Sequence, residues 1–166
     1  VYAAATNTQA TISWGAPSST GGSTITGYTV TASPGGQTVT IDGQTLTTTF
    51  TGLNNGTSYT FTVIATNSVG HGSTSTPSSA VTPATVPGVP TNVYANAANT
   101  QATVNWNAPS SIEGSTVTAY TVTASPGGQT TTWSSGALTA TVTGLTNGTT
   151  YTFTVTATNA VGNSAA

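Results

Sequence analysis

The feature that most constrains the fold is a stretch that occurs twice, as NGTSYTFTVIATNSVG over residues 55–70 and as NGTTYTFTVTATNAVG over residues 147–162. In the first copy Tyr59, Phe61 and Val63 alternate with threonine. Because successive side chains of a strand point to opposite faces of the sheet, this alternation predicts a β-strand with one buried face. The stretch indicates a β-sheet protein and contains no motif for a reaction or a ligand.

The repeat extends over almost the whole chain. When the sequence is aligned with itself at an offset of 92 residues it matches without a gap, so that Trp14 falls on Trp106 and Tyr28 falls on Tyr120. A period of this length, with several strands in each repeat, indicates consecutive β-domains rather than a short-repeat solenoid. Each repeat is close to the size of a small self-sufficient domain.

The boundary between the repeats is rich in proline, with the sequence PATVPGVP over residues 83–90. Proline fixes its own φ angle and favours extended conformations in the residue before it. We interpret residues 84–90 as a short, stiff connector that runs into the first strand of the second repeat. Module 1 is then expected at residues 1–83 and module 2 at residues 91–166.

Within module 1, short runs of threonine and apolar residues lie between turns rich in Gly, Pro and Asn, which predicts an all-β sandwich. The expected strands are residues 1–6, 10–14, 26–33, 37–41 and 45–50, the long strand after Gly56, and residues 78–82. The side chains expected to face inward from the second and third strands are Ala10, Ile12, Trp14, Tyr28, Val30 and Ala32.

The same order of aromatic and turn residues runs through both modules. In module 1 it consists of Trp14, Gly27, Tyr28, Val30, Leu53, Gly56, Thr57, Tyr59, Phe61 and Val63. In module 2 it consists of Trp106, Tyr120, Val122, Leu145, Gly148, Thr149, Tyr151, Phe153 and Val155, with Ala119 in place of Gly27. This pattern resembles the fibronectin type III family, in the form found in secreted and surface bacterial proteins. The resemblance implies two tandem, seven-stranded, immunoglobulin-like sandwiches without disulfides, a fold that hosts many functions.

Module 2 differs from module 1 at its C-terminal end. The sequence stops at Ala166, so module 2 has no counterpart of residues 76–82, which include the last strand of module 1. A sandwich without this strand is expected to expose backbone polar groups and core side chains. Either the natural chain continues, or a strand of another subunit fills the gap. We favour the first alternative, because the N-terminus carries no spare matching strand.

The charge composition excludes several classes of partner. The chain has no Lys or Arg, and Asp42 and Glu113 are its two acidic residues. Binding to nucleic acids or to anionic lipids requires cationic side chains, so neither is expected. No apolar run approaches the roughly 20 residues that span a membrane. The formal net charge of −2 gives little repulsion between copies, which favours self-association, although a surface of Thr, Ser and Asn can equally stay soluble.

No set of residues matches a catalytic or metal centre. A glycosidase needs two carboxylates within about 5–10 Å, whereas Asp42 and Glu113 fall in different modules. Asp42 with Gly43 is better explained as a turn, and Glu113 as a solvated loop residue. There is no Cys and a single His, so nucleophile–base pairs and metal sites are not expected either. We predict a protein that is not an enzyme and that needs no cofactor.

Four residues remain as candidate contact or modification sites. His71, flanked by glycines, lies on a loop where many type III modules bind partners, although a solvated loop residue is the more frequent case. Trp133 aligns with Ile41 on an edge strand and offers a flat face to a sugar ring or to another copy. The alternative that its ring folds over the sandwich edge is favoured. Asn55 and Asn147 begin N-glycosylation sequons, which turn formation also explains.

These features favour a non-catalytic extracellular or cell-surface structural module, the repeat unit of a fibre, filament or stalk. Its expected partners are copies of itself or neighbouring modules of the same protein. The alternative is a spacer, or a carbohydrate- or protein-binding module, of a larger secreted enzyme or adhesin. Binding to a soluble glycan would favour this alternative.

Overall fold

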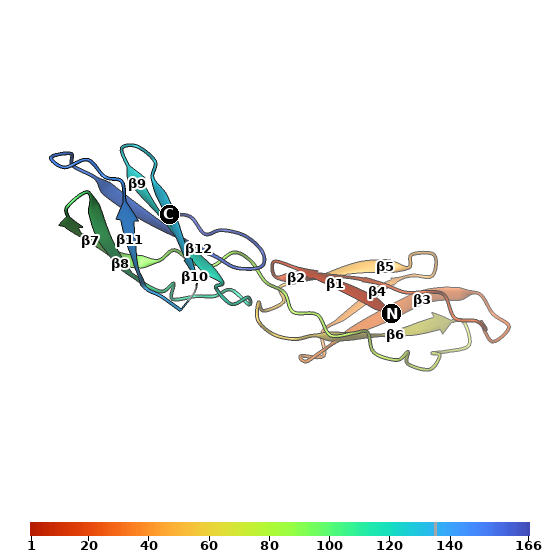
Figure 1. The fold of residues 1–166 in the computed structure, drawn as a ribbon. Coiled ribbons are helices and arrows are strands. Elements are labelled where there is room, and N and C mark those ends of the chain that lie inside the picture. Colours follow the sequence, from red (N-terminus) through yellow and green to blue (C-terminus); the bar gives the residue numbers. More distant parts are fainter. Residues whose placement is uncertain (135) are drawn as a thin grey trace. The chain divides into compact units, whose positions relative to one another are not determined.

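The structure is a computed structural model that describes residues 1–134 and 136–166. The chain divides into two compact units, Val1–Ala84 (unit 1) and Thr85–Ala166 (unit 2). Over the described residues each unit is built from antiparallel strands and contains no helix (Figure 1). The all-β prediction is therefore confirmed.

Unit 1 contains two three-stranded sheets that enclose one core. The first sheet has the order β1-β2-β5, with bounds Tyr2–Thr6, Gln9–Ser13 and Thr47–Thr51. The second has the order β4-β3-β6, with bounds Thr38–Asp42, Ile25–Ser33 and Thr60–Asn67. The chain passes from one sheet to the other between β2 and β3, so the two sheets pack as the sandwich that the turn spacing predicts.

The core of unit 1 is formed by the side chains that alternation places on the inner faces. Ile12, Val30 and Phe61 are completely buried, each with 0% of its surface exposed. Trp14 packs edge-on against Tyr28, with ring centroids 5.5 Å apart. The side chains expected to face inward from the second and third strands are all buried, so that prediction is confirmed.

Residues 75–83 form an extended segment, here called the closing segment. It runs beside Tyr59 and β6, along the edge of β6 that does not pair with β3. Its backbone N–H groups donate to three carbonyls, Ser75 to Val63, Ser78 to Phe61 and Val81 to Tyr59, each at 2.9 Å. In return the hydroxyl oxygens of two serines accept backbone N–H groups, Ser75 from Val63 at 2.9 Å and Ser78 from Phe61 at 3.1 Å.

The closing segment corrects one detail of the sequence prediction. A regular strand was expected over residues 78–82, but the only ladder pair that this segment forms within the described chain is a single bridge between Tyr59 and Val81. Serine hydroxyls take the place of carbonyl acceptors, and Pro77 has no N–H to donate. Unit 1 therefore has six strands and a seventh, irregular segment that completes the sheet.

Unit 2 repeats this architecture. One sheet has the order β11-β8-β7, with bounds Thr139–Thr143, Gln101–Asn107 and Thr91–Ala98. The other has the order β10-β9-β12, with bounds Thr130–Ser134, Ala119–Ser125 and Thr152–Thr158. Val104 and Val122 are fully buried in its core. Trp106 packs against Tyr120 with ring centroids 5.3 Å apart, as Trp14 packs against Tyr28 in unit 1.

The segment that leads into β7 belongs to unit 2 from Thr85 onward. Thr85 N–H donates to the carbonyl of Glu113 at 3.0 Å, and Gly88 N–H donates to the carbonyl of Ser111 at 3.1 Å. The amide of Asn159 donates to the carbonyl of Thr85 at 2.7 Å. These bonds hold the proline-rich stretch against the loops of unit 2.

Candidate functional site

The two carboxylates are each engaged by their own loop. The Asp42 oxygen Oδ1 accepts the N–H groups of Gln44 and Thr45, both at 2.8 Å, and Oδ2 accepts the Thr45 hydroxyl at 3.0 Å. These bonds, the one from Gln44 foremost, hold the pKa of Asp42 below its ordinary value of 3.8. Asp42 therefore acts as the turn residue that the sequence predicts.

Glu113 departs from its prediction as a solvated loop charge. Its side chain is half-buried and accepts the Ser111 hydroxyl, while its carbonyl accepts the N–H of Thr85. Its φ angle of 51° lies in the left-handed region. Glu113 is thus part of the contact that holds the entry segment of unit 2, a role that depends on a contact distant in sequence.

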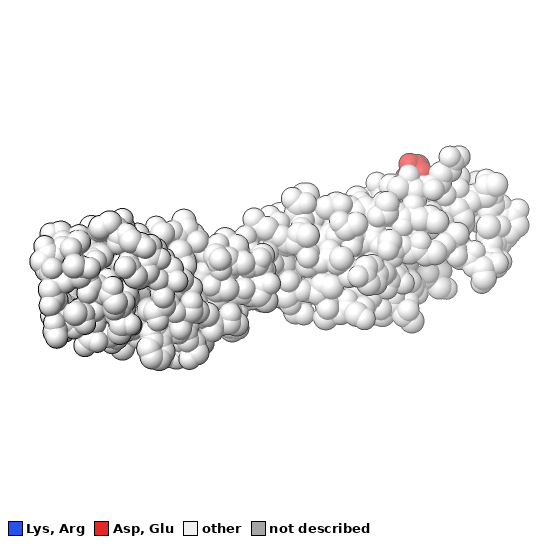
Figure 2. Space-filling view, turned by 45° about the horizontal axis from the view of Figure 1, so that its top comes forward, with Lys and Arg blue, Asp and Glu red and all other residues white. Residues whose placement is uncertain are grey.

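The surface carries almost no charge. The face shown in Figure 2 has no basic side chain and a small acidic spot. Among the described residues no group of three or more His, Cys, Asp and Glu side chains could hold a metal ion. The arrangement therefore offers hydroxyl, amide and apolar groups rather than ionic ones.

His71 is exposed on the loop after β6, as expected. Its ring atom Nδ1 lies 2.9 Å from the hydroxyl of Thr66, with which it shares a hydrogen bond. In unit 2 the aligned residue Asn163 accepts a hydrogen bond from the Thr158 hydroxyl at 2.8 Å. His71 and Asn163 make the same local contact with a threonine hydroxyl. Holding the loop is therefore a sufficient role for the side chain at this position.

Trp133 lies on β10, an edge strand, opposite Tyr120 in the register. Its side chain is 43% exposed. The aligned Ile41 instead packs against the core of unit 1. The exposed indole thus remains available for the contact that the sequence analysis considers.

Asn55 and Asn147 join turns that lie far apart in sequence. The oxygen Oδ1 of Asn55 accepts the N–H of Thr8 at 2.9 Å, and its Nδ2 donates to Oδ1 of Asn7 at 2.9 Å. Asn147 makes the same two bonds in unit 2, with Thr100 at 3.0 Å and Asn99 at 2.8 Å. The sequon asparagines therefore have a structural role in each unit.

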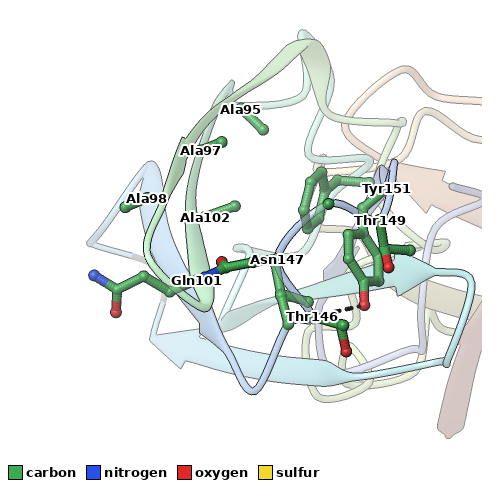
Figure 3. Close-up of a pocket in the computed structure, with 12 residues that line it drawn as sticks. Ala95, Ala97, Ala98, Gln101, Ala102, Thr146, Asn147, Thr149 and Tyr151 are labelled. Atoms are coloured by element: carbon green, nitrogen blue, oxygen red, sulfur yellow. Dashed lines mark hydrogen bonds between the residues drawn. The ribbon is translucent and has the colours of Figure 1, made fainter.

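Unit 2 carries a groove that the sequence analysis did not describe as a binding site. It has a volume of about 220 Å³ and lies between β7 and β12 (Figure 3). We call it the β7–β12 groove; it is lined by Ala95, Ala97, Ala98, Gln101, Ala102, Leu145, Thr146, Asn147, Gly148, Thr149, Tyr151 and Phe153. Its lining residues come from β7, β8, β12 and the loop between β11 and β12, so it depends on contacts between segments that are distant in sequence.

The groove corresponds to the space that the closing segment fills in unit 1. There Val81 packs against the core and Pro83 is fully buried, with its carbonyl accepting the N–H of Gly56 at 2.9 Å. Phe61 is 0% exposed beneath the segment, whereas the aligned Phe153 is only half-buried.

No helix long and apolar enough to cross a membrane occurs in the part of the chain that the structure describes.

Comparison with known proteins places the two units in one family. A family model described as fibronectin type III domain matches residues 1–81 and 88–166. Endoglucanase B of Cellulomonas fimi is 37% identical over 175 aligned residues, which cover 98% of this chain and 16% of the endoglucanase. The phosphatidylinositol phosphatase PTPRQ of Rattus norvegicus is 38% identical over 104 residues, which cover 62% of this chain and 4% of the phosphatase.

One solved structure is matched at low identity. The crystal structure of chicken CNTN1 FN1-FN3 domains matches with a TM-score of 0.47 and 20% identity, over 98% of this chain and 61% of that chain. The chain spans a small part of the length of the curated relatives that it matches. Because the family model covers both units, the chain belongs to the fibronectin type III family, as two consecutive domains.

Proposed function

We propose that this pair of domains is a non-catalytic, extracellular spacer in a larger polysaccharide-processing protein. The observation that carries the proposal is the alignment with Endoglucanase B, which takes in 98% of this chain and 16% of the relative. Both domains together thus align with a small stretch of a much longer protein named for glycan cleavage. A spacer needs a stable fold and an inert surface, and it needs no reactive group.

The surface chemistry supports an inert role. The chain has no Lys or Arg, and Asp42 and Glu113 are held by hydrogen bonds within their own loops. Proteases attack exposed loops, and those that cleave after Lys or Arg find no site in this sequence. A surface of hydroxyl and amide groups stays hydrated without attracting charged molecules.

The proposal is tested by incubating the chain with insoluble cellulose and with soluble β-glucans, and by assaying for released sugar. A spacer is expected to remain in the supernatant, to bind no glycan and to release no sugar. Retention on cellulose that is lost in Trp133→Ala would instead make this a carbohydrate-binding module. Sugar release by the purified chain would refute a non-catalytic role.

A second candidate function is the repeat unit of a surface fibre. The low net charge of −2 favours it, because copies repel one another little. Electron microscopy of the material isolated without denaturant distinguishes the two roles. Regular fibres with a repeat of one or two domains would support the structural role, and separate particles would support the spacer.

A further inference from the structure

We propose that the β10 edge, the side of Thr130–Ser134 that faces away from β9, is a dimerisation site whose partner is the same edge of a second copy of this chain. β10 is the outermost strand of the β10-β9-β12 sheet and pairs with β9 on its other side (Figure 1). The proposal goes beyond the spacer role and does not depend on it.

The ladder between β10 and β9 determines which backbone groups of β10 point away from the sheet. In an antiparallel ladder, hydrogen-bonded and non-hydrogen-bonded residue pairs alternate. Directly before β10, the N–H of Ala124 donates to the carbonyl of Gln129 at 2.8 Å. Continuing the alternation from this pair, Thr131 and Trp133 bond to β9. The residues whose N–H and C=O groups point outward are then Thr130, Thr132 and Ser134.

β10 lacks the features that protect many edge strands from pairing with another strand, namely a charged side chain, a proline or a bulge. The aligned edge of unit 1 has two of them. There β4 ends at the charged Asp42, and β3 has a register shift between Ile25 and Gly27, next to the residue that pairs with Asp42. β10 instead has the sequence TTTWS and pairs with β9 in unbroken register. Its outward groups are therefore open to another strand.

β10 is complementary to itself when a second copy lies antiparallel to it. If a two-fold axis passes beside Thr132, this residue faces its own counterpart, and Thr130 faces Ser134 of the partner subunit. Outward groups then meet outward groups along the whole strand, so each N–H has a carbonyl opposite it. The Ser134 carbonyl also accepts the N–H of Ala137 at 3.3 Å, but a carbonyl oxygen has a second lone pair for the new bond.

Trp133 supplies the apolar contact of this pairing. It lies opposite Tyr120 in the ladder, and Tyr120 is buried in the core, so the indole is on the inner face of the sheet at its edge. In the two-fold arrangement Trp133 faces Thr131 of the partner subunit in a non-hydrogen-bonded pair, where side chains approach most closely. The exposed part of the indole then covers the methyl group of this threonine. An aromatic and a β-branched side chain form a favourable cross-strand pair.

The charge of the chain is compatible with a second copy as the partner. The net charge is −2, and both acidic residues, Asp42 and Glu113, lie outside β10, so two copies repel one another little. A charged foreign strand would find no opposite charge along the sequence TTTWS. Because a two-fold contact uses the same edge on both copies, it closes after two subunits and builds a dimer instead of a fibre.

The test is sedimentation velocity of the 166-residue chain over a range of concentrations, with amide hydrogen exchange measured on the same samples. We expect an equilibrium between monomer and dimer. Exchange at the amide of Thr132 should slow as the dimer forms, because this N–H gains a carbonyl acceptor. Exchange at the aligned Thr40 of β4 should not depend on concentration, which makes it an internal control.

Two substitutions of Thr132 separate the edge contact from the fold. Thr132→Pro removes an N–H that β9 does not use, so the sheet of unit 2 stays paired while the new ladder is broken. Thr132→Lys places two like charges opposite each other at the two-fold axis. Each should weaken dimerisation by about tenfold or more. The matched controls, Thr40→Pro and Thr40→Lys in β4, should leave dimerisation unchanged, and urea unfolding followed at Val104 shows whether unit 2 is folded.

Several results would overturn the proposal. One is a chain that stays monomeric up to its solubility limit. Another is a dimer that both Thr132 variants leave intact, or that the Thr40 variants weaken equally, because the contact would then lie elsewhere. Growth beyond two subunits would also contradict a two-fold contact. The spacer role is tested separately by the glycan assays, so either proposal can fail without the other.

Discussion

Replacing Asn159 with alanine tests whether a single buried amide holds the entry segment of unit 2. Asn159 is 4% exposed, and its Oδ1 accepts the N–H groups of Val161 at 2.9 Å and Gly162 at 3.1 Å. Its Nδ2 donates to the carbonyl of Thr85 at 2.7 Å and, more weakly, to that of Ser115 at 3.4 Å. The substitution removes three well-formed hydrogen bonds.

The expected loss follows from burial. Each net hydrogen bond contributes about 1 kcal/mol, so three give a destabilisation of about 3 kcal/mol. The aligned Asn67 makes three comparable bonds, to Val69, Gly70 and Thr20, but is only half-buried. Water can replace more of them there, so Asn67→Ala should cost about 1–2 kcal/mol.

The measurement is urea unfolding followed by the amide signals of Val104 for unit 2 and Val30 for unit 1. Asn159→Ala should lower the urea midpoint measured at Val104 and leave the midpoint at Val30 unchanged. Asn67→Ala should lower the midpoint at Val30 and leave the midpoint at Val104 unchanged. Amide exchange at Gly88 should also accelerate in Asn159→Ala, since the entry segment loses its anchor. Equal losses of stability in the two variants would refute the argument from burial.

Three further predictions concern other parts of the two units. Phe61→Ala should destabilise unit 1 by about 3–5 kcal/mol, and Phe153→Ala should destabilise unit 2 by about half as much, because Phe153 is half-buried; equal losses in urea unfolding would contradict this. Asn55→Ala should destabilise unit 1 by about 1–2 kcal/mol by removing two hydrogen bonds, and a change in unit 2 instead would exclude this explanation. The lowered pKa of Asp42 means that its stabilisation is complete above pH 3.8 and is lost as the pH falls through the folded value. In Asp42→Asn the acid-induced fall in the unfolding midpoint of unit 1 should therefore be smaller.

The strands could be predicted because their information is local. Alternation places Tyr28, Val30 and Phe61 inside, and all are buried. The bounds agree closely, as for residues 10–14 against Gln9–Ser13. A two-residue period and turn residues at the ends suffice for such assignments.

The remaining features depend on contacts between distant segments, which a single sequence does not encode visibly. The hydroxyls of Ser75 and Ser78 accept backbone N–H groups that carbonyls accept in a regular ladder. In the sequence, serine residues are typical of a loop. The sequence predicts Glu113 to be a solvated loop residue, but its backbone carbonyl accepts the N–H of Thr85. The β7–β12 groove was not predicted, because its walls come from β7, β12 and the turn at Asn147, which are distant in sequence.

The near-absence of charge has a consequence for the conditions that these domains tolerate. Salt acts on proteins partly by screening interactions between charges. The distance over which two charges interact falls from about 10 Å at 0.1 M salt to about 3 Å at 1 M. A chain without Lys or Arg presents almost nothing for ions to screen. The fold is held mainly by apolar burial and by neutral hydrogen bonds, so screening by salt is expected to change its stability little.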